Sequence, residues 1–348
     1  MGRRTALAIA RVAATFAGTI IGAGFASGQE LLQFFVVYGN IGLAGIVLAG
    51  VLFAWLGNRM LDLGYQLQAA SYHQLLYHLC GKRIALLLDI IIAAFLFSVL
   101  TIMLAGSGTI FRDNFALPFG LGIGLLALMV TTITLRGISG IAAANMIAAP
   151  VLAVSIISIS LYSLYYHDFT LEFLNITADH SAYPAPHWLL ASLLYVSYNL
   201  VMGTTVLAPL GAATPSRICR RLGSMIGGIV LAVLACLVAI TVMLHYPGIM
   251  GKEIPMLYIS SIQHCVNGTV YSVMLLTAMF TTALASLYGC ATTLTAASGL
   301  KFPFCVAIVI SCSVIFSQVG FANLITVLFP VFGYATLWFL IKLIFRRA

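Results

Sequence analysis

The segment of residues 18–30, GTIIGAGFASGQE, lies in the middle of the first long apolar run of the chain and is unusual for a helix in lipid. Glycine destabilises a helix by about 1 kcal/mol relative to alanine. An ionisable side chain costs roughly 2.5–3.5 kcal/mol at the bilayer centre on insertion scales. Because lipid offers no partner to a free backbone group, the segment predicts a broken helix whose free groups line a cavity.

The composition places the rest of the chain in a membrane as well. The chain is 62% apolar and 7% charged, with a mean hydropathy of +1.11, whereas a soluble domain carries about 25% charged residues. The seven cysteines show no CxxC spacing and no histidine at metal-ligand spacing, so we expect neither a disulfide nor a metal cluster. Neither HExxH nor GxSxG occurs, and we expect no enzyme activity.

Apolar runs of about 20 residues, the length that crosses a bilayer, predict an all-α polytopic membrane protein with ten transmembrane helices in one domain, 1–348. The shorter segments 71–80 and 253–265 predict an interfacial helix and a helix over the outer mouth. The predicted transmembrane helices are 5–38, 41–62, 84–111, 119–135, 140–166, 187–210, 219–245, 268–298, 303–317 and 321–345.

The basic residues predict the orientation, since short cytoplasmic loops are enriched in Lys and Arg. With the N-terminus inside, fourteen of the sixteen basic residues face the cytoplasm, and only Arg112 and Lys252 fall outside. Both termini are therefore expected to be cytoplasmic, in a bacterial-type inner membrane. The net charge of +8 follows from this topology, so we expect the lipid bilayer and a small molecule as partners, and no nucleic acid.

A second interrupted pattern occurs in the sixth predicted helix, which contains YVSYNLVMGTTVLAPLG (195–211). Tyr198, Asn199 and Gly203 interrupt its apolar run. Pro209 removes a backbone donor nearer the inner end. The first and sixth helices are five apart, so two five-helix repeats, about 5–166 and 187–345, must enter the membrane in opposite directions. Paired interruptions of this kind are typical of transporter sites. Close helix packing explains glycines four apart equally well, and for the sixth helix alone the two interpretations are balanced.

These motifs resemble the amino acid–polyamine–organocation superfamily with its LeuT-type fold, and GTIIGAGFASGQE is most similar to YkvI-like bacterial permeases. The resemblance implies a 5+5 inverted repeat with the first and sixth helices broken. It also implies a secondary active transporter of an amino acid or similar small amphoteric solute, which works by alternating access as the first, second, sixth and seventh helices rock against the remainder. A non-transporting nutrient receptor on the same fold stays open as an alternative.

The resemblance implies a substrate site at the two breaks. Backbone N–H groups at the start of the outer half of the first helix would bind the substrate carboxylate, because a helix N-terminus attracts anions. Carbonyls freed in the sixth helix would accept from the amine. The implied residues are Gly22, Ala23, Gly24, Phe25 and Ser27 in the first helix, and Tyr198, Asn199, Leu200 and Met202 in the sixth.

The resemblance also implies a sodium ion as the coupling ion, with no other cofactor. Its ligands would be the carbonyls of Gly18 and Ile21 with Ala278, Thr281 and Thr282 of the eighth helix. The spacing i, i+3, i+4 places the last three on one helical face. The alternative is that the hydroxyls only bond to the preceding turn.

Glu30 and Arg11 are the remaining candidates, for coupling or gating. Glu30 lies eight residues after Gly22, about 12 Å along a straight helix, and is expected near the outer vestibule. It would carry a proton, gate the site, bind a cationic substrate, or only reach water there. Arg11 is expected to pair with Asp62 or Asp89 at the inner end.

Overall fold

The computed structural model describes residues 3–69, 72–136, 141–166 and 184–345, and this part of the chain is helical without strands. The α-helices are α1 (Arg3–Ile20), α2 (Ala23–Ser27), α3 (Gln29–Phe34), α4 (Asn40–Gln66), α5 (Tyr72–Cys80), α6 (Lys82–Phe115), α7 (Phe119–Arg136), α8 (Ile141–Tyr166), α9 (Trp188–Ala212), α10 (Arg217–Leu244), α11 (Pro255–Gln263), α12 (Cys265–Ser298), α13 (Phe302–Phe316) and α14 (Phe321–Phe345). Short 3-10 turns, η1 (Val36–Tyr38) and η4 (Ser317–Val319), follow α3 and α13.

Eight of these helices are long and apolar enough to cross a membrane, and they coincide with eight of the ten predicted spans. Two shorter apolar helical stretches, Thr5–Ile20 and Pro150–Tyr166, lie within the first and fifth predicted spans. The all-α membrane architecture is therefore confirmed. The first and fifth predicted spans are not among these eight, so the number ten stays a prediction.

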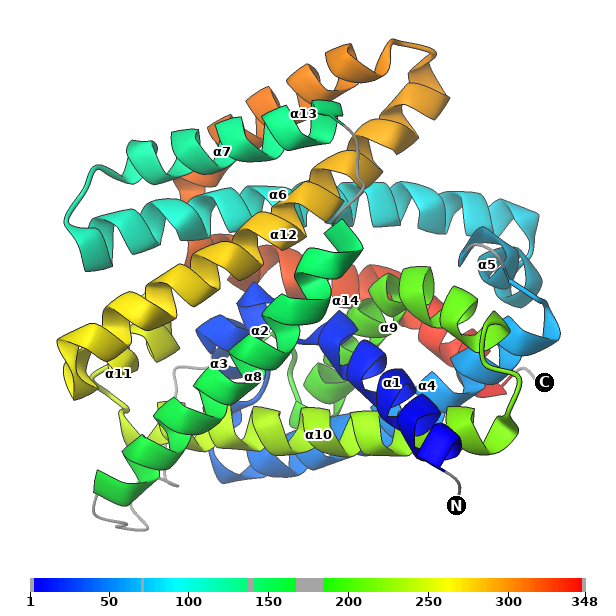
Figure 1. Cartoon of the computed structure of the whole chain (residues 1–348), viewed down its shortest axis with the longest axis horizontal. Coiled ribbons are helices and arrows are strands. Elements are labelled where there is room, and N and C mark those ends of the chain that lie inside the picture. Colours follow the sequence, from blue (N-terminus) through cyan, green and yellow to red (C-terminus); the bar gives the residue numbers. More distant parts are fainter. Residues whose placement is uncertain (1–2, 70–71, 137–140, 167–183, 346–348) are drawn as a thin grey trace.

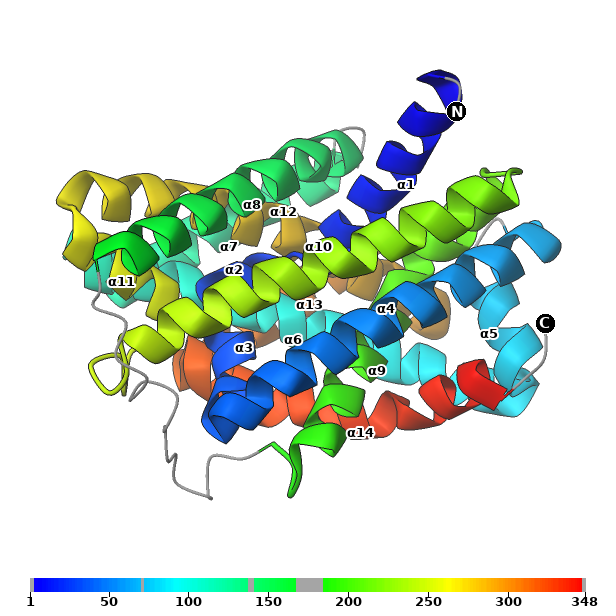
Figure 2. The same ribbon diagram turned by 90° about the horizontal axis from the view of Figure 1, so that it is seen from below.

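The two short helices predicted outside the spans are present as α5 and α11. They lie at opposite ends of the molecule (Figures 1 and 2). The beginning of α1 and the end of α14 are at the same end as α5. The chain therefore starts and finishes its crossings on one side, as the predicted topology requires.

The long helices pack in two groups. In the first group α4 packs against α9 and α10, and α1 packs against α10 and α9. In the second group α6 and α12 pack against one another and against α7, and α12 also packs against α8. Helix α14 joins the groups, since it contacts both α9 and α6. Figure 2 shows the first group with α4 and α10 along one face of the molecule.

Two glycines let α4 and α9 approach closely near the end of the molecule that holds α5. A Cβ at Gly64 would lie 2.3 Å from the Ala208 carbonyl oxygen, and a Cβ at Gly211 would lie 2.2 Å from the Leu61 carbonyl oxygen. Gly64 thus faces the backbone of α9 and Gly211 faces the backbone of α4, and no side chain would fit at either position. This contact fixes how far α9 is shifted along α4. It therefore also sets which residues of α9 lie beside the first transmembrane segment.

Candidate functional site

The first transmembrane segment is broken directly before Gly22, as its sequence predicts. The last backbone hydrogen bond of α1 runs from Ile21 N to Ala17 O at 2.9 Å, and the next in the described chain runs from Ala26 N to Gly22 O at 3.0 Å. Gly22 itself has extended backbone, with φ −110° and ψ −175°. The carbonyls that end α1 and the N–H groups that begin α2 therefore lie at the break, where a helix has no internal partners for them.

A second break follows at Gly28, and the sequence analysis did not predict it. Gly28 has φ +80° and ends α2, in a left-handed conformation that glycine adopts without steric cost. The hydroxyl of Ser27 donates to Gly24 O at 2.6 Å and accepts from Gln29 N at 3.1 Å across this turn. The Ser-Gly pair is a turn signal in itself. Ser27, predicted as a substrate ligand, is thus engaged in closing the turn.

The turn at Gly28 brings Glu30 back to the first break. Its carboxyl packs against Gly24, so that a Cβ added to Gly24 would lie 1.9 Å from Glu30 Oε1. The hydroxyl of Tyr198 on α9 donates to Glu30 Oε2 at 3.2 Å. Glu30 is only 8% exposed. Of the alternatives for Glu30, a carboxylate that only reaches water at the outer mouth does not fit this burial. The expected distance of about 12 Å from Gly22 assumed one straight helix, and the turn at Gly28 removes that assumption.

Helix α9 is not broken, which corrects the predicted interruption of the sixth span. It runs continuously from Trp188 to Ala212, with Pro209 in its last turn. Asn199, whose side chain suggested a break, bonds instead to a carbonyl one turn earlier, since its Nδ2 donates to Tyr195 O at 2.9 Å. Thr204 Oγ1 likewise donates to Val201 O at 2.5 Å. Back-bonding of this kind is compatible with a continuous helix. The carbonyls expected to bind a substrate amine are thus within the helix.

Of the four residues predicted on α9, only Tyr198 contacts the broken helix through a side-chain hydrogen bond. Leu200 is fully buried and lies about 200° around the helix from Tyr198, since each residue turns by about 100°. Asn199 bonds to its own helix, and Met202 is partly buried against the apolar core. The structure therefore joins Tyr198 to the broken helix by a hydrogen bond, whereas the side chains of the other three residues make no hydrogen bond to it.

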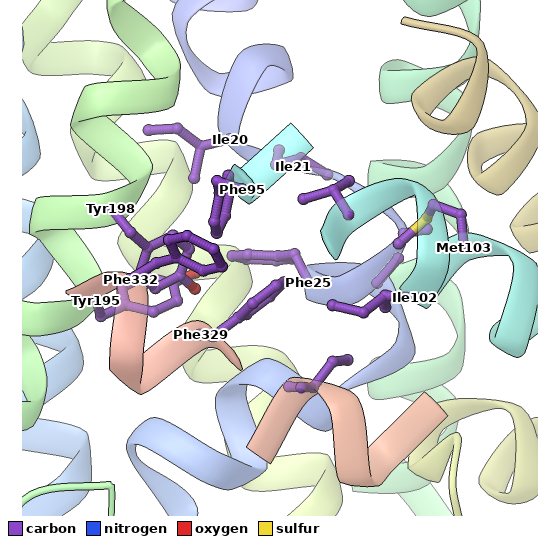
Figure 3. Close-up of a cluster of buried hydrophobic side chains, with 14 of the residues drawn as sticks. Ile20, Ile21, Phe25, Phe95, Ile102, Met103, Tyr195, Tyr198, Phe329 and Phe332 are labelled. Carbon is purple, nitrogen blue, oxygen red and sulfur yellow. The ribbon is translucent and has the colours of Figure 1, made fainter. Parts of the chain in front are cut away.

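An aromatic cluster surrounds Tyr198, and it includes residues that the sequence analysis missed. Figure 3 shows Phe25, Phe95, Phe329 and Tyr195 gathered with Tyr198 beside the break. The ring centroid of Tyr198 lies 5.1 Å from that of Phe329, 5.8 Å from Phe95 and 5.6 Å from Tyr195. Phe95 comes from α6 and Phe329 from α14. No sequence signal distinguishes these two from the other aromatic residues of the spans.

The predicted sodium ligands of α12 lie on a buried face of that helix. Ala278 and Thr281 are buried and Thr282 is partly buried, and the Thr281 hydroxyl donates to Ala278 O at 3.1 Å. Helix α12 packs against α2, to which the Tyr271 hydroxyl also bonds through Ala26 O. The other two predicted ligands, Gly18 and Ile21, are in the last turn of α1 and directly after it. These five residues thus come from segments that adjoin the first break.

Arg11 does not make the predicted ion pair. It is exposed on α1 and has no ion pair in the described part of the chain. Asp62 pairs with Arg220 at 2.7 Å and Asp89 with His73 at 3.1 Å. Arg220 also donates to two loop carbonyls and lies over the ring of Tyr65, so it is held beside Asp62.

Comparison with other sequences gives two relatives in Bacillus subtilis. The chain is 26% identical to the uncharacterized membrane protein YkvI over 347 residues, which cover 97% of this chain and 96% of YkvI. It is 28% identical to the uncharacterized protein YyaD over 335 residues, 94% of this chain and 93% of that protein. No family model matches the chain.

Comparison with solved structures identifies transporters of the LeuT-type fold. The chain superposes on a manganese transporter of Eremococcus coleocola with a TM-score of 0.67 at 14% identity, covering 99% of this chain and 80% of that one. It superposes on MhsT in complex with L-phenylalanine with a TM-score of 0.63 at 18% identity, covering 98% and 86%. A Na+-coupled sialic acid symporter gives 0.63 at 13% identity, covering 97% and 79%. The predicted resemblance to YkvI-like proteins of this fold is confirmed, and these structures are of transporters, not enzymes.

Proposed function

We propose that this chain is a secondary active transporter of an amino acid or similar small amphoteric solute, coupled to sodium. The observation that carries the proposal is the break of the first helix inside a LeuT-type fold. Free backbone groups lie there beside a buried carboxyl and a cluster of aromatic rings. A Cβ added at Gly22 would meet no atom within 4 Å, so the break faces open space. Broken helices that line such a space are the substrate sites of many secondary transporters.

The packing of the helices supports the two inverted repeats, about 5–166 and 187–345, within one membrane domain. Numbering the spans in order, the contacts among the long helices have counterparts five spans further on. The contact of α4 with α9 corresponds to that of α10 with α1, and α6 with α7 corresponds to α12 with α13. Likewise α8 with α12 corresponds to α14 with α6. A ten-span arrangement with a five-span repeat accounts for this pattern.

The substrate carboxylate would bind at the N–H groups of Ala23, Gly24 and Phe25, beside Gly22, because these begin α2 and lack helical acceptors. Alternating access would move α1, α4, α9 and α10 against the rest. The packing of these four helices into one group supports such a motion. The N- and C-termini would face the cytoplasm of a bacterial inner membrane, in agreement with the distribution of basic residues.

Sodium would be held by the carbonyls of Gly18 and Ile21 with Ala278, Thr281 and Thr282. Neutral oxygens suit a hard monovalent cation, and Ala278 and Thr281 lie on a buried face of α12. The Thr281 hydroxyl donates to Ala278 O in this structure, and the ion would take both oxygens in place of that hydrogen bond. The similarity to a Na+-coupled symporter supports this choice of ion. Because the substrate would bind together with the ion, the sodium gradient would drive its uptake.

Uptake into proteoliposomes tests the proposal, with a panel of labelled amino acids and with or without a sodium gradient. We expect saturable sodium-driven uptake that is lost in Thr281→Ala and in Thr282→Ala. Thr277→Ala is the matched control, because Thr277 is on the same helix, is exposed, and bonds only to Val273 O. Binding of an amino acid without any flux would identify a receptor and overturn the proposal.

Proton coupling through Glu30 is the second candidate, favoured by the burial of this carboxyl in the site. It predicts uptake that is driven by a pH gradient without sodium, and a loss of that drive in Glu30→Gln. Sodium-driven uptake that is independent of the pH gradient would exclude it.

A further inference from the structure

We infer that Glu30 binds a positively charged nitrogen of the solute, so that the substrates are compounds with an ammonium group and an apolar body. The inference rests on the proposed substrate site and adds the charge and the recognition element of its ligand. It covers amines as well as amphoteric solutes that carry an ammonium group.

Glu30 is a buried acid without a cationic partner. Among the described residues the ion pairs involve Asp62, Asp89, Asp113 and Glu253, which lie toward helix ends or in a loop, and none involves Glu30. A buried carboxylate is costly unless it is both hydrogen-bonded and paired. The Tyr198 hydroxyl supplies a hydrogen bond to Oε2. The ionised form of Glu30 lacks a cation, and a solute that enters the space at Gly22 would supply it.

The rings around Tyr198, the hydrogen-bond partner of Glu30, favour a cation with an apolar body. Tyr198, which bonds to the carboxyl, also contacts the rings of Phe34, Phe95 and Phe329, with centroids 5.1–5.8 Å away. Aromatic faces attract ammonium groups, and more strongly where water is excluded. The Tyr195 hydroxyl, 2% exposed, has no hydrogen-bond partner in the described structure. The cluster thus combines apolar surface with an unused polar atom.

The acceptor for the ammonium group cannot come from the backbone of α9. That helix is continuous, and its carbonyls at Tyr195 and Val201 also accept from side chains one turn later. Glu30 is instead held at the break, because the missing side chain of Gly24 leaves room for its carboxyl. A carboxylate in this position takes over the role expected of α9 carbonyls.

Ligand binding to the purified full-length protein in detergent tests the inference, with the shift in melting temperature and the affinity as readouts. The probes are three matched sets that share a methyl, butyl or phenethyl body and end in an ammonium, a hydroxyl or a carboxylate. We expect an ammonium probe to bind roughly tenfold or more tightly than its matched alcohol, the change produced by one charged contact. No stabilisation by any ammonium probe, or equal binding of alcohols or carboxylates, would overturn the inference.

Substitutions at Glu30 locate the contact. Glu30→Gln should abolish the preference for ammonium over alcohol, and Glu30→Asp should reduce it, because the shorter side chain draws the carboxylate away from the ammonium group and leaves the affinity for the alcohol nearly unchanged. Asp113→Asn is the matched control, since it removes an exposed carboxylate that pairs with Arg112, and it should change neither affinity. If the Gln variant does not fold, the preference measured in Glu30→Asp decides. A purely structural role for Glu30 would leave the ratio of the two affinities unchanged in either variant, and would contradict the inference.

The outcomes separate this inference from the proposed function. Ammonium-selective binding without uptake in proteoliposomes would support the inference and overturn the transporter. Sodium-driven uptake that is equal for ammonium compounds and their neutral analogues would support the transporter and overturn the inference. If Glu30 only carries a proton, Glu30→Gln would bind ammonium probes as the wild type does, and the inference would fail.

Discussion

The first transmembrane segment and α9 carry similar sequence patterns and fold differently. Both are apolar and both contain glycine among polar residues, yet the first segment breaks at Gly22 and turns again at Gly28, whereas α9 is continuous. In α9 the side chains of Asn199, Thr204 and Thr205 bond to carbonyls of the preceding turn. In the first segment the breaks are at glycines, which have no side chain to do so.

A polar residue in a transmembrane span therefore does not by itself indicate a break in the helix. What matters is whether its side chain can bond within its own helix, and whether glycine sits where the backbone must leave the helical region. Gly28 satisfies the second condition with its positive φ. The glycines of α9 are helical, and we expect them to serve packing. Four substitutions test this difference, in order of expected effect.

Gly211→Ala should destabilise the protein most. Its Cβ would lie 2.2 Å from the Leu61 carbonyl oxygen, 2.9 Å from Leu61 C and 2.9 Å from Leu61 Cα, so that α4 and α9 must separate. Overpacking of this kind costs about 1–3 kcal/mol, and we expect the upper end because the contact is with backbone. Thermal unfolding in detergent measures the effect. An unchanged melting temperature would show that Gly211 is not required for the close packing of α4 against α9.

Gly28→Ala should destabilise by about 2 kcal/mol, since a left-handed residue with a Cβ costs roughly 1–2 kcal/mol and the new methyl group also meets Met256 Cγ at 2.9 Å. Gly251→Ala is the matched control, because Gly251 has a similar φ of +76° and no atom within 4 Å of its Cβ. The difference between the two melting temperatures measures the contact with α11. A smaller loss in Gly28→Ala than in Gly251→Ala would contradict the turn described here.

Gly24→Ala should leave the fold nearly unchanged and weaken substrate binding by roughly tenfold, about 1.4 kcal/mol. Its Cβ meets the flexible end of Glu30, which can move away but then leaves Tyr198. Gly22→Ala, with no atom within 4 Å of its Cβ, is the comparison for stability. Calorimetric titration of the purified variants with an ammonium probe measures the effect. Equal affinity of the Gly24→Ala variant and the wild type for the ammonium probe would show that Glu30 does not contact the ligand.

These differences also explain which parts of the site could be predicted from the sequence. The break at Gly22 follows from clustered glycines in a lipid-spanning run, and α5 and α11 follow from segments too short to span. The position of Glu30 does not follow, because it depends on the dihedral angles of one residue, Gly28. Phe95 and Phe329 reach the site only through the packing of α6 and α14, which local patterns do not encode.

Gly203→Ala should have the smallest effect, and it should be a gain. The position is in the interior of α9, and the nearest atom to a new Cβ is Leu207 Cδ1 at 3.5 Å, an ordinary contact. Alanine in place of a helical glycine stabilises by about 0.5–1 kcal/mol, so the melting temperature should rise. If α9 also stays continuous during transport, uptake in proteoliposomes should be unchanged. A higher melting temperature with impaired uptake would mean that α9 unwinds at Gly203 in another state of the cycle, and the contrast between the two helices would then hold for this conformation alone.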